Sequence, residues 1–223
     1  MSGCSRIELR LPRYSNPTIA NLLPCPLLSL ATYQLQGVGR NHRPWLSPYD
    51  VLQWSLLLEL PLGLEHLTQK LDPFMHLIGL TVVETCRLYL PITTASAVAL
   101  KWPNDIYATV KGRLEKIGGI VVNNIPRTLP GSRNRIVIGE GNPPFEFHLF
   151  NAITGCGLNI RKYGPVCSLS RLATTDISME EVLAHVMARF SRYWDEFLLA
   201  DGSFADFEER YKNTWLHRQV AVS

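Results

Sequence analysis

The sequence feature that most constrains the fold is an apolar run that stops at a proline. Ala95 to Leu100 is hydrophobic enough to form a buried strand, and the pentapeptide Lys101-Trp-Pro-Asn-Asp105 follows it directly. Because proline has no backbone N–H to donate to a sheet, the strand is expected to end there. Asn104 and Asp105 are then predicted to lie on a loop beyond a strand end, where ligand-binding groups often lie. The alternative is a Trp-Pro corner followed by a solvated turn.

Composition indicates one sizeable core. The chain has 223 residues, 46% of them hydrophobic and 18% charged, as is typical of a globular protein. Its net charge of +3 is too small to favour nucleic acid as a partner. No apolar stretch approaches the ~18 residues that a membrane-spanning helix needs, so no membrane association is expected.

The cysteines predict a reducing compartment. Five of them are spread widely along the chain and none forms a C-x-x-C pair, so neither a zinc site nor a disulfide framework is indicated. The chain starts with Arg6, Arg10 and Arg13 but has no apolar segment directly after them, which argues against a secretory signal. A cytoplasmic location is therefore predicted, and an organellar transit peptide stays open as the alternative.

The pattern along the chain favours an α+β fold, with a mixed β-sheet and helices packed on it, because strands and helices do not alternate strictly. Helix signals are Asp72-Pro73 at one start, and Ser178 with Glu181 as a capping box at another. A last helix is expected from about Phe204 to Trp215. The expected strands are Leu27–Gln34, Val51–Leu60, Ala95–Trp102, Ile117–Asn123 and Arg135–Gly139, with a loop over Gly37–Asp50.

Two further segments carry residue types suited to an anionic ligand. The glycines of Gly37-Val-Gly-Arg40 permit close backbone approach to an anion, although His42 in the third glycine position excludes a dinucleotide fingerprint. Lys116 precedes Gly118 and Gly119, whose missing side chains would let the lysine reach into a narrow pocket. A mobile surface loop and a solvated lysine are the alternatives for these two segments.

Taken as literal strings, these segments resemble the signature of biotin protein ligases. Lys101-Trp-Pro-Asn-Asp105 followed by Lys116-Ile-Gly-Gly is the specific part of the resemblance. Weaker matches, in the same order as in the family, are Thr32–Arg40, Trp45-Leu-Ser-Pro48, Gly155-Cys-Gly-Leu-Asn159 and Trp215-Leu-His217. The resemblance extends over roughly residues 14 to 220.

The resemblance implies a class II synthetase-like catalytic domain over residues 27–220, after an irregular segment of residues 1–26. A small C-terminal β domain that many family members carry is expected to be absent from this sequence. The implied activity is ATP-dependent attachment of biotin to a lysine of biotin-dependent carboxylases, through biotinyl-5′-AMP. The implied cofactors are ATP and Mg²⁺, and the implied partners are biotin carboxyl carrier domains.

The resemblance also implies roles for individual residues. Lys116, Arg40 and Asp105 would be catalytic, and Asp105 would also hold Mg²⁺. The residues implied to contact biotin are Thr18, Gln34, Val38, Gly39, Arg40 and Lys116. The residues implied to contact ATP or the adenylate are Arg40, Trp45, Lys101, Asn104, Asp105 and Asn159.

The chain departs from the family pattern near the ligand. Val38 stands where the family's glycine-arginine loop has its first arginine, and Asn41 and Asp50 replace glycines. Residues 140–154 form an extra stretch where the family runs directly from a strand into its G-x-G element. Two alternatives to an active ligase therefore stay open. One is a degenerate or truncated relative that binds biotin or the acceptor with little turnover, and the other is a lipoyl-type acyl ligase.

Overall fold

The computed structural model describes residues 25–31, 34–38, 44–47, 51–60, 72–125, 135–139, 156–161 and 167–216. In residues 34–38, 44–47, 123–125 and 135–139 it describes the backbone but not the side chains. The expected site residues Thr18, Gly39 and Arg40, and the whole of the extra stretch 140–154 with its neighbour Gly155, lie outside the described residues.

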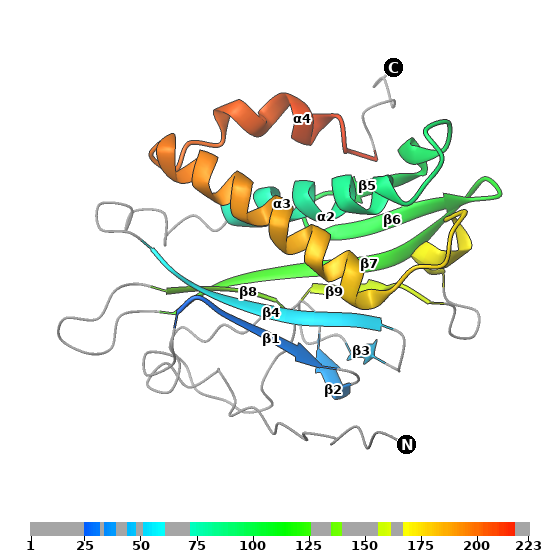
Figure 1. Cartoon of the computed structure of the whole chain (residues 1–223), viewed down its shortest axis with the longest axis horizontal. Coiled ribbons are helices and arrows are strands. Elements are labelled where there is room, and N and C mark those ends of the chain that lie inside the picture. Colours follow the sequence, from blue (N-terminus) through cyan, green and yellow to red (C-terminus); the bar gives the residue numbers. More distant parts are fainter. Residues whose placement is uncertain are drawn as a thin grey trace.

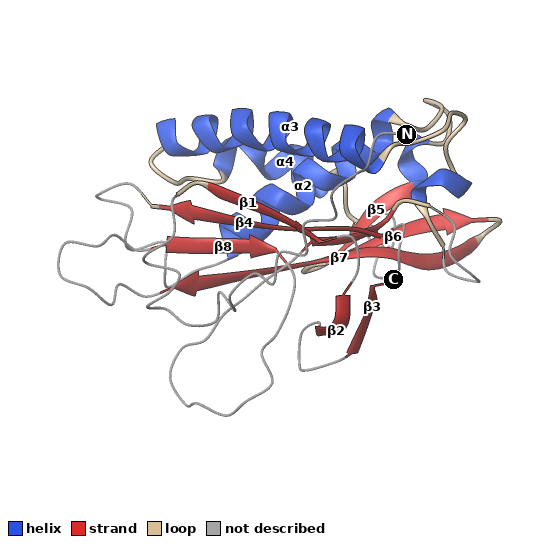
Figure 2. Cartoon of the chain, turned by 60° about the horizontal axis from the view of Figure 1, so that its bottom comes forward, coloured by secondary structure: helices blue, strands red, loops and turns tan. Residues whose placement is uncertain are grey.

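A seven-stranded sheet forms the base of the molecule, and a separate two-stranded sheet lies apart from it (Figure 2). The strand order of the large sheet is β1-β4-β8-β7-β6-β5, and β9 pairs with both β4 and β7. The strands of the large sheet are β1 (Leu27–Ala31), β4 (Val51–Glu59), β5 (Val98–Lys101), β6 (Asp105–Val110), β7 (Arg113–Ile125), β8 (Arg135–Gly139) and β9 (Cys156–Asn159). The small sheet pairs β2 (Gln34–Val38) with β3 (Pro44–Ser47).

Three helices cover one face of the large sheet (Figure 1). They are α2 (Asp72–Leu88), α3 (Met179–Leu199) and α4 (Glu208–Lys212). Short 3₁₀ turns lie at Ala95–Ala97, Leu169–Arg171 and Ala205–Phe207. The α+β class predicted from the sequence is confirmed. The strand pairs of the sheet are antiparallel, and a parallel contact occurs at the single bridge between Leu100 and Trp215.

The core lies between the sheet and the helices because alternate strand residues point toward it. On β4, Leu52, Trp54, Leu56 and Leu58 join the core, so Val51, Gln53 and Ser55 point to the opposite face. The same alternation sends Ile106 of β6 inward and Asp105 outward. The face away from the helices is called the open face below.

One carboxylate links the three helices. Glu84 of α2 accepts hydrogen bonds from Arg189 of α3 at 3.0 Å and from Arg210 of α4 at 2.9 Å. The Tyr193 hydroxyl also donates to Glu84, and its ring is fully buried. Because breaking a partly buried charge network leaves a charge uncompensated, this cluster holds α4 in place over the other two helices.

Several predicted elements are confirmed. Strand β4 and the helix starting at Asp72 lie where the sequence predicted them, and β8 has the predicted bounds. Ser178 caps α3 by accepting the Glu181 backbone N–H at 3.3 Å, which is one of the two hydrogen bonds of the predicted capping box. The carboxylate that meets the Ser178 hydroxyl is that of the neighbouring residue Glu180, at 2.6 Å.

The hairpin β6–β7 was missed by the sequence analysis. The predicted strand Ile117–Asn123 covers only half of β7, which starts at Arg113, and β6 was not predicted at all. Lys111 and Gly112 have φ values of 50° and 75°, the left-handed pair that a two-residue hairpin turn requires. The Lys-Gly dipeptide between two alternating runs was the available signal.

Four other predicted boundaries are corrected. The predicted strand Leu27–Gln34 divides, because Ala31 ends β1 in the large sheet whereas Gln34 opens β2 in the small one. The predicted loop Gly37–Asp50 contains β3, which pairs with β2. The predicted strand Ala95–Trp102 is shorter, since its first three residues form a 3₁₀ turn and Lys101 ends it. The predicted helix Phe204–Trp215 contains only the short α4, after a 3₁₀ turn.

Strands β8 and β9 lie end to end in the sheet. Gly139, the last residue of β8, pairs with Ser55, and Cys156, the first residue of β9, pairs with the next residue of β4, Trp54. On the other side they pair with the consecutive residues Val121 and Ile120 of β7. Gly139 and Cys156 therefore occupy successive positions of one strand path, and residues 140–155 are inserted between them.

Candidate active site

The turn Trp102–Asn104 joins β5 to β6, and its flanking residues Lys101 and Asp105 are paired across the hairpin. The peptide bond between Trp102 and Pro103 is cis. Asp105 was predicted on a loop and is instead the first residue of β6. The correction has a simple cause, because the proline ends β5 and the tight turn returns the chain at once into a neighbouring strand.

Asn104 fastens this turn to β7. Its side-chain Nδ2 donates to the Ile120 carbonyl at 2.9 Å, and the Ile120 N–H donates to the Asn104 carbonyl at 2.9 Å. The turn therefore cannot move without breaking two hydrogen bonds to a central strand. This contact gives Asn104 a positioning role, and its predicted contact with the adenylate stays a prediction.

A bulge in β7 brings Lys116 onto the open face beside Asp105. Ile106 pairs with Gly118 and Tyr107 pairs with Lys116, so β7 carries one extra residue at Ile117. In a regular strand Lys116 and Gly119, which are three residues apart, would point to opposite faces, and the bulge places both on the open face. With it, Lys116 Nζ donates to Asp105 Oδ1 at 2.6 Å. Both side chains are half-buried, 35% and 27% exposed.

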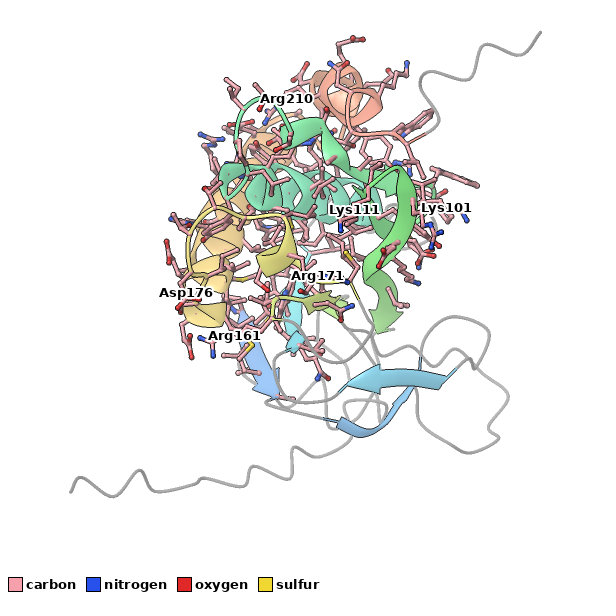
Figure 3. All side chains as sticks on the ribbon, turned by 90° about the vertical axis from the view of Figure 1, so that its right-hand side faces the viewer. Lys101, Lys111, Arg161, Arg171, Asp176 and Arg210 are labelled. Carbon is pink, nitrogen blue, oxygen red and sulfur yellow. The ribbon has the colours of Figure 1, made fainter. Side chains whose placement is uncertain are left out.

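Tyr107, which the sequence analysis missed, completes the charged cluster on this face. It pairs with Lys116 across the β6–β7 hairpin, and Lys101 Nζ lies 5.1 Å from the centre of its ring. Figure 3 shows Lys101 at the edge of the sheet. The two lysines and Asp105 sum to one positive charge, which suits an anionic ligand.

Gly118 and Gly119, which follow Lys116 in β7, are required for different structural reasons. A Cβ on Gly118 would lie 2.8 Å from the Gly157 carbonyl oxygen, closer than two such atoms can approach. A Cβ on Gly119 would lie 3.6 Å from Asp105 Oδ1 and from Lys116 Nζ, at ordinary contact distance. Gly118 therefore lets the strands approach each other, and Gly119 keeps space free beside the lysine–aspartate pair.

Asn159 lies at the end of β9, opposite Val51, on the open face. Its Nδ2 donates to the Cys167 carbonyl at 3.0 Å, and the residue is only 8% exposed. The side chain thus holds the segment that follows β9 against the sheet. Its predicted contact with adenine stays a prediction.

The remaining predicted site residues belong to the small sheet. Gly37 pairs with Trp45 and Val38 pairs with Pro44, so residues 39–43 connect two paired strands. Only the backbone of Gln34, Val38 and Trp45 is described. Their predicted ligand contacts stay predictions.

The cysteines and histidines in the described residues serve packing. Burial raises the pKa of the Cys86 thiol to about 12, and Cys156 is fully buried in the core. His76 stacks on Tyr211 with ring centres 4.5 Å apart, and His185 bonds the Tyr89 hydroxyl at 2.7 Å. Within the described residues no three His, Cys, Asp or Glu side chains gather as a metal site.

The fold and the site define a class of protein: an antiparallel sheet covered by helices on one face, with a lysine–aspartate pair beside a glycine gap on the other. Residues 14–139 match the model of the biotin/lipoate A/B protein ligase family. This match covers more than half of the chain, and the chain belongs to that family.

Individual relatives agree with this assignment. A biotin–protein ligase of Schizosaccharomyces pombe is 28% identical over 213 residues, covering 87% of this chain and 30% of that protein. The chain therefore spans less than a third of the length of this relative.

Solved structures confirm the fold. The biotin protein ligase from Aquifex aeolicus in complex with biotin and ATP has a TM-score of 0.60 at 22% identity, covering 91% of this chain and 75% of that one. The Leishmania major enzyme in complex with biotin has a TM-score of 0.61 at 17% identity, covering 94% and 82%. Among the described residues, no helix has the length and hydrophobicity to cross a bilayer.

Proposed function

We propose that this chain is the catalytic domain, residues 27–220, of a biotin–protein ligase. The observation that carries the proposal is the half-buried Lys116–Asp105 pair beside Gly119 on the open face. The family match supports it, and the relatives carry the names of biotin–protein ligases. The acceptor would be the biotin carboxyl carrier domain of a carboxylase.

In the first step, a carboxylate oxygen of biotin attacks the α-phosphorus of ATP. The bond from that phosphorus to the bridging oxygen breaks, and pyrophosphate leaves with biotinyl-5′-AMP as product. Two anions must approach each other, so a cation between them lowers the barrier. Lys116 supplies this charge, and Asp105 holds its ammonium group in place through the 2.6 Å hydrogen bond.

In the second step, the amine of an acceptor lysine attacks the acyl carbon of the intermediate. The carbon–oxygen bond to AMP breaks, an amide forms, and the amine loses its proton. No side chain rises from Gly119 on the open face, so the reacting groups would lie there beside Lys116. Lys116 stabilises the phosphate of the leaving AMP in the same way as in the first step.

The site also suits Mg²⁺ bound together with ATP. Mg²⁺ is usually held by one or two carboxylates and the phosphates of its substrate, so a preformed cluster of ligands is not required. Asp105 offers a carboxylate next to the proposed phosphate position and would hold the ion. When bound, Mg²⁺ neutralises charge on the phosphates.

A cytoplasmic location fits the thiols. Cys86 and Cys167, both within the described residues, form no disulfide. Free thiols are typical of a reducing compartment. A location in an organelle is the alternative.

The first prediction tests this function through Lys116. Biotin-dependent exchange between ATP and pyrophosphate should be detectable for the unaltered protein and fall about 10²–10³-fold in Lys116→Ala. Lys212→Ala is the matched control, because Lys212 is also ion-paired to a carboxylate but lies on α4, on the helix side of the sheet. It should leave the exchange unchanged.

Three results would contradict the proposal or part of it. Exchange with lipoate but not with biotin would identify the lipoyl-type alternative. Biotin binding without exchange would identify the degenerate relative, consistent with Val38 in place of an arginine. Equal exchange in Lys116→Ala and Lys212→Ala would remove Lys116 from the site.

A further inference from the structure

A glutamine on β4 is buried without a hydrogen-bond partner. Gln53 is 1% exposed, and within the described residues neither its Nε2 nor its Oε1 has a partner. Its chain neighbours Leu52 and Trp54 point into the core, so Gln53 points to the open face. Burying an unpaired carboxamide costs stability, so such a side chain is expected to meet a ligand or water there.

Gln53 lies in one row with the lysine–aspartate pair. Residues that pair directly on neighbouring strands have their side chains on the same face of the sheet. Starting from Ala31, each residue can be followed to its partner on the next strand across the sheet. That series is Ala31, Gln53, Gly157, Gly119, Asp105 and Lys101. Three strand spacings, roughly 14 Å, separate the Cα atoms of Gln53 and Asp105. Both positions between them are glycines, so no side chain rises from the row between the carboxamide and the charged pair.

We propose that Gln53 recognises the cyclic ureido group of biotin while the reacting carboxylate lies at Lys116. This assignment rests on the proposed function. A carboxamide offers a donor and an acceptor side by side, and a cyclic urea offers an N–H and a C=O along one edge. The two groups can therefore form a pair of antiparallel hydrogen bonds.

The position of Gln53 favours biotin over adenine, which also offers a donor and an acceptor on one edge. Ala31, which pairs with Gln53, ends β1 three residues before Gln34, and Gln34 opens the glycine-bearing hairpin predicted to contact biotin. The Gln53 end of the row is therefore nearer to the β2–β3 hairpin than the Asp105 end is. The ureido ring would lie there, and the acyl chain would run over Gly157 and Gly119 toward Lys116.

The test replaces Gln53 with methionine, which has similar length and no hydrogen-bonding amide. Calorimetry should show biotin affinity reduced about tenfold or more, because two hydrogen bonds are lost, and ATP affinity unchanged. The melting temperature of the ligand-free protein should rise by about 2–4 °C, since an unpaired polar group leaves the interior.

Thr85→Val is the matched control. Its hydroxyl is also fully buried without a partner in the described residues, but Thr85 lies on α2, on the other side of the sheet. Thr85→Val should raise the melting temperature and leave biotin affinity unchanged. Gln53→Ala serves as a second variant, and N-methylated biotin, which lacks one ureido N–H, should bind both Gln53 variants and the unaltered protein with similar affinity.

Each contrary result has a distinct meaning. If biotin affinity is unchanged in both Gln53 variants, the assignment is wrong while the proposed function stands. A loss of ATP affinity instead would place adenine at Gln53, and a fall in the melting temperature of the ligand-free protein would show an internal partner. If the unaltered protein binds no biotin, the proposed function itself fails.

Discussion

At the scale of single residues, two neighbouring glycines show how little space the site allows. Gly118 faces a backbone oxygen that cannot move aside, whereas Gly119 faces the flexible end of Lys116 and the Asp105 carboxylate. Neither position requires a left-handed backbone. The reason for each glycine is therefore close approach, of two strands in one case and of a ligand in the other.

The two alanine variants should separate stability from activity. Gly118→Ala should lower the free energy of unfolding by about 1–3 kcal/mol, because the added methyl group forces the strands apart. Gly119→Ala should leave it unchanged or raise it by about 0.5–1 kcal/mol, since alanine restricts the unfolded chain. Urea denaturation measures both changes.

The activities of these two variants should differ in the opposite sense. Gly119→Ala should reduce biotin-dependent exchange, because its methyl group fills the space beside Lys116. Gly118→Ala should retain exchange under conditions where it is folded. Full exchange in Gly119→Ala would show that the ligand does not pass over this position.

The residues of the candidate site could be predicted only in part from the sequence. Lys116 and Asp105 stand out in the sequence because each belongs to a distinctive string. Gln53 does not, because it is a lone polar residue in an apolar run, and its importance depends on which face it occupies and on the absence of a partner. A polar residue in the middle of an apolar predicted strand was the available signal.

At the scale of elements, β8 and β9 form one strand path into which residues 140–155 are inserted. Joining Gly139 directly to Cys156 should leave both strands paired with β4 and β7. Closing a loop of this length costs about 2.5 kcal/mol, so the deletion should raise the free energy of unfolding by up to that amount. Thermal unfolding and biotin-dependent exchange measure the result.

A deletion longer by one residue is the control. Joining Gly139 to Gly157 shifts the register by one position and would turn Leu158 out of the core and Asn159 into it. Because such a slip reverses every side chain of the strand, this variant should fail to fold. Equal stability of the two deletions would show that β8 and β9 are not one path.

At the scale of the whole molecule, the C-terminal segment packs against helix α2 and also forms hydrogen bonds to β5, the strand at the edge of the sheet. His76 of α2 stacks on Tyr211 of α4, and Phe204 also packs against His76. Beyond α4, the Leu100 N–H donates to the Thr214 carbonyl at 2.7 Å, and the Leu216 N–H donates to the Leu100 carbonyl at 2.8 Å. The end of β5, directly before the turn at Trp102–Asn104, is thereby held by residues more than a hundred positions later.

This packing predicts a pH dependence. Burial lowers the pKa of His76, although Asp72 opposes the shift by favouring the charged ring. The unfolded chain therefore binds a proton more readily than the folded one. As the pH falls below the ordinary value of about 6.5, stability should decrease until the folded-state pKa is passed.

The contribution of His76 is measured by comparing urea midpoints at pH 7.5 and pH 5.5. The decrease on acidification should be smaller in His76→Gln, which cannot be protonated. His185→Gln is the control, because His185 lies on the other long helix and bonds the exposed hydroxyl of Tyr89. An equal decrease in His76→Gln and the unaltered protein would contradict the assignment.

The sequence by itself determined the features that depend on neighbouring residues. The end of β5 before Pro103, the helix start at Asp72, the cap at Ser178 and the strand at Val51–Leu60 all follow from local chemistry, and so they were predicted. The strings around Asp105 and Lys116 also indicated the family. The tertiary structure alone decided how these segments meet.

The bulge at Ile117 turns Lys116 toward Asp105, and strand pairing brings Gln53 into one row with them through Gly157 and Gly119. Neither arrangement can be derived from local pattern. Register depends on hydrogen bonds between strands far apart in the chain, and a shift of one residue would move each of these side chains to the other face.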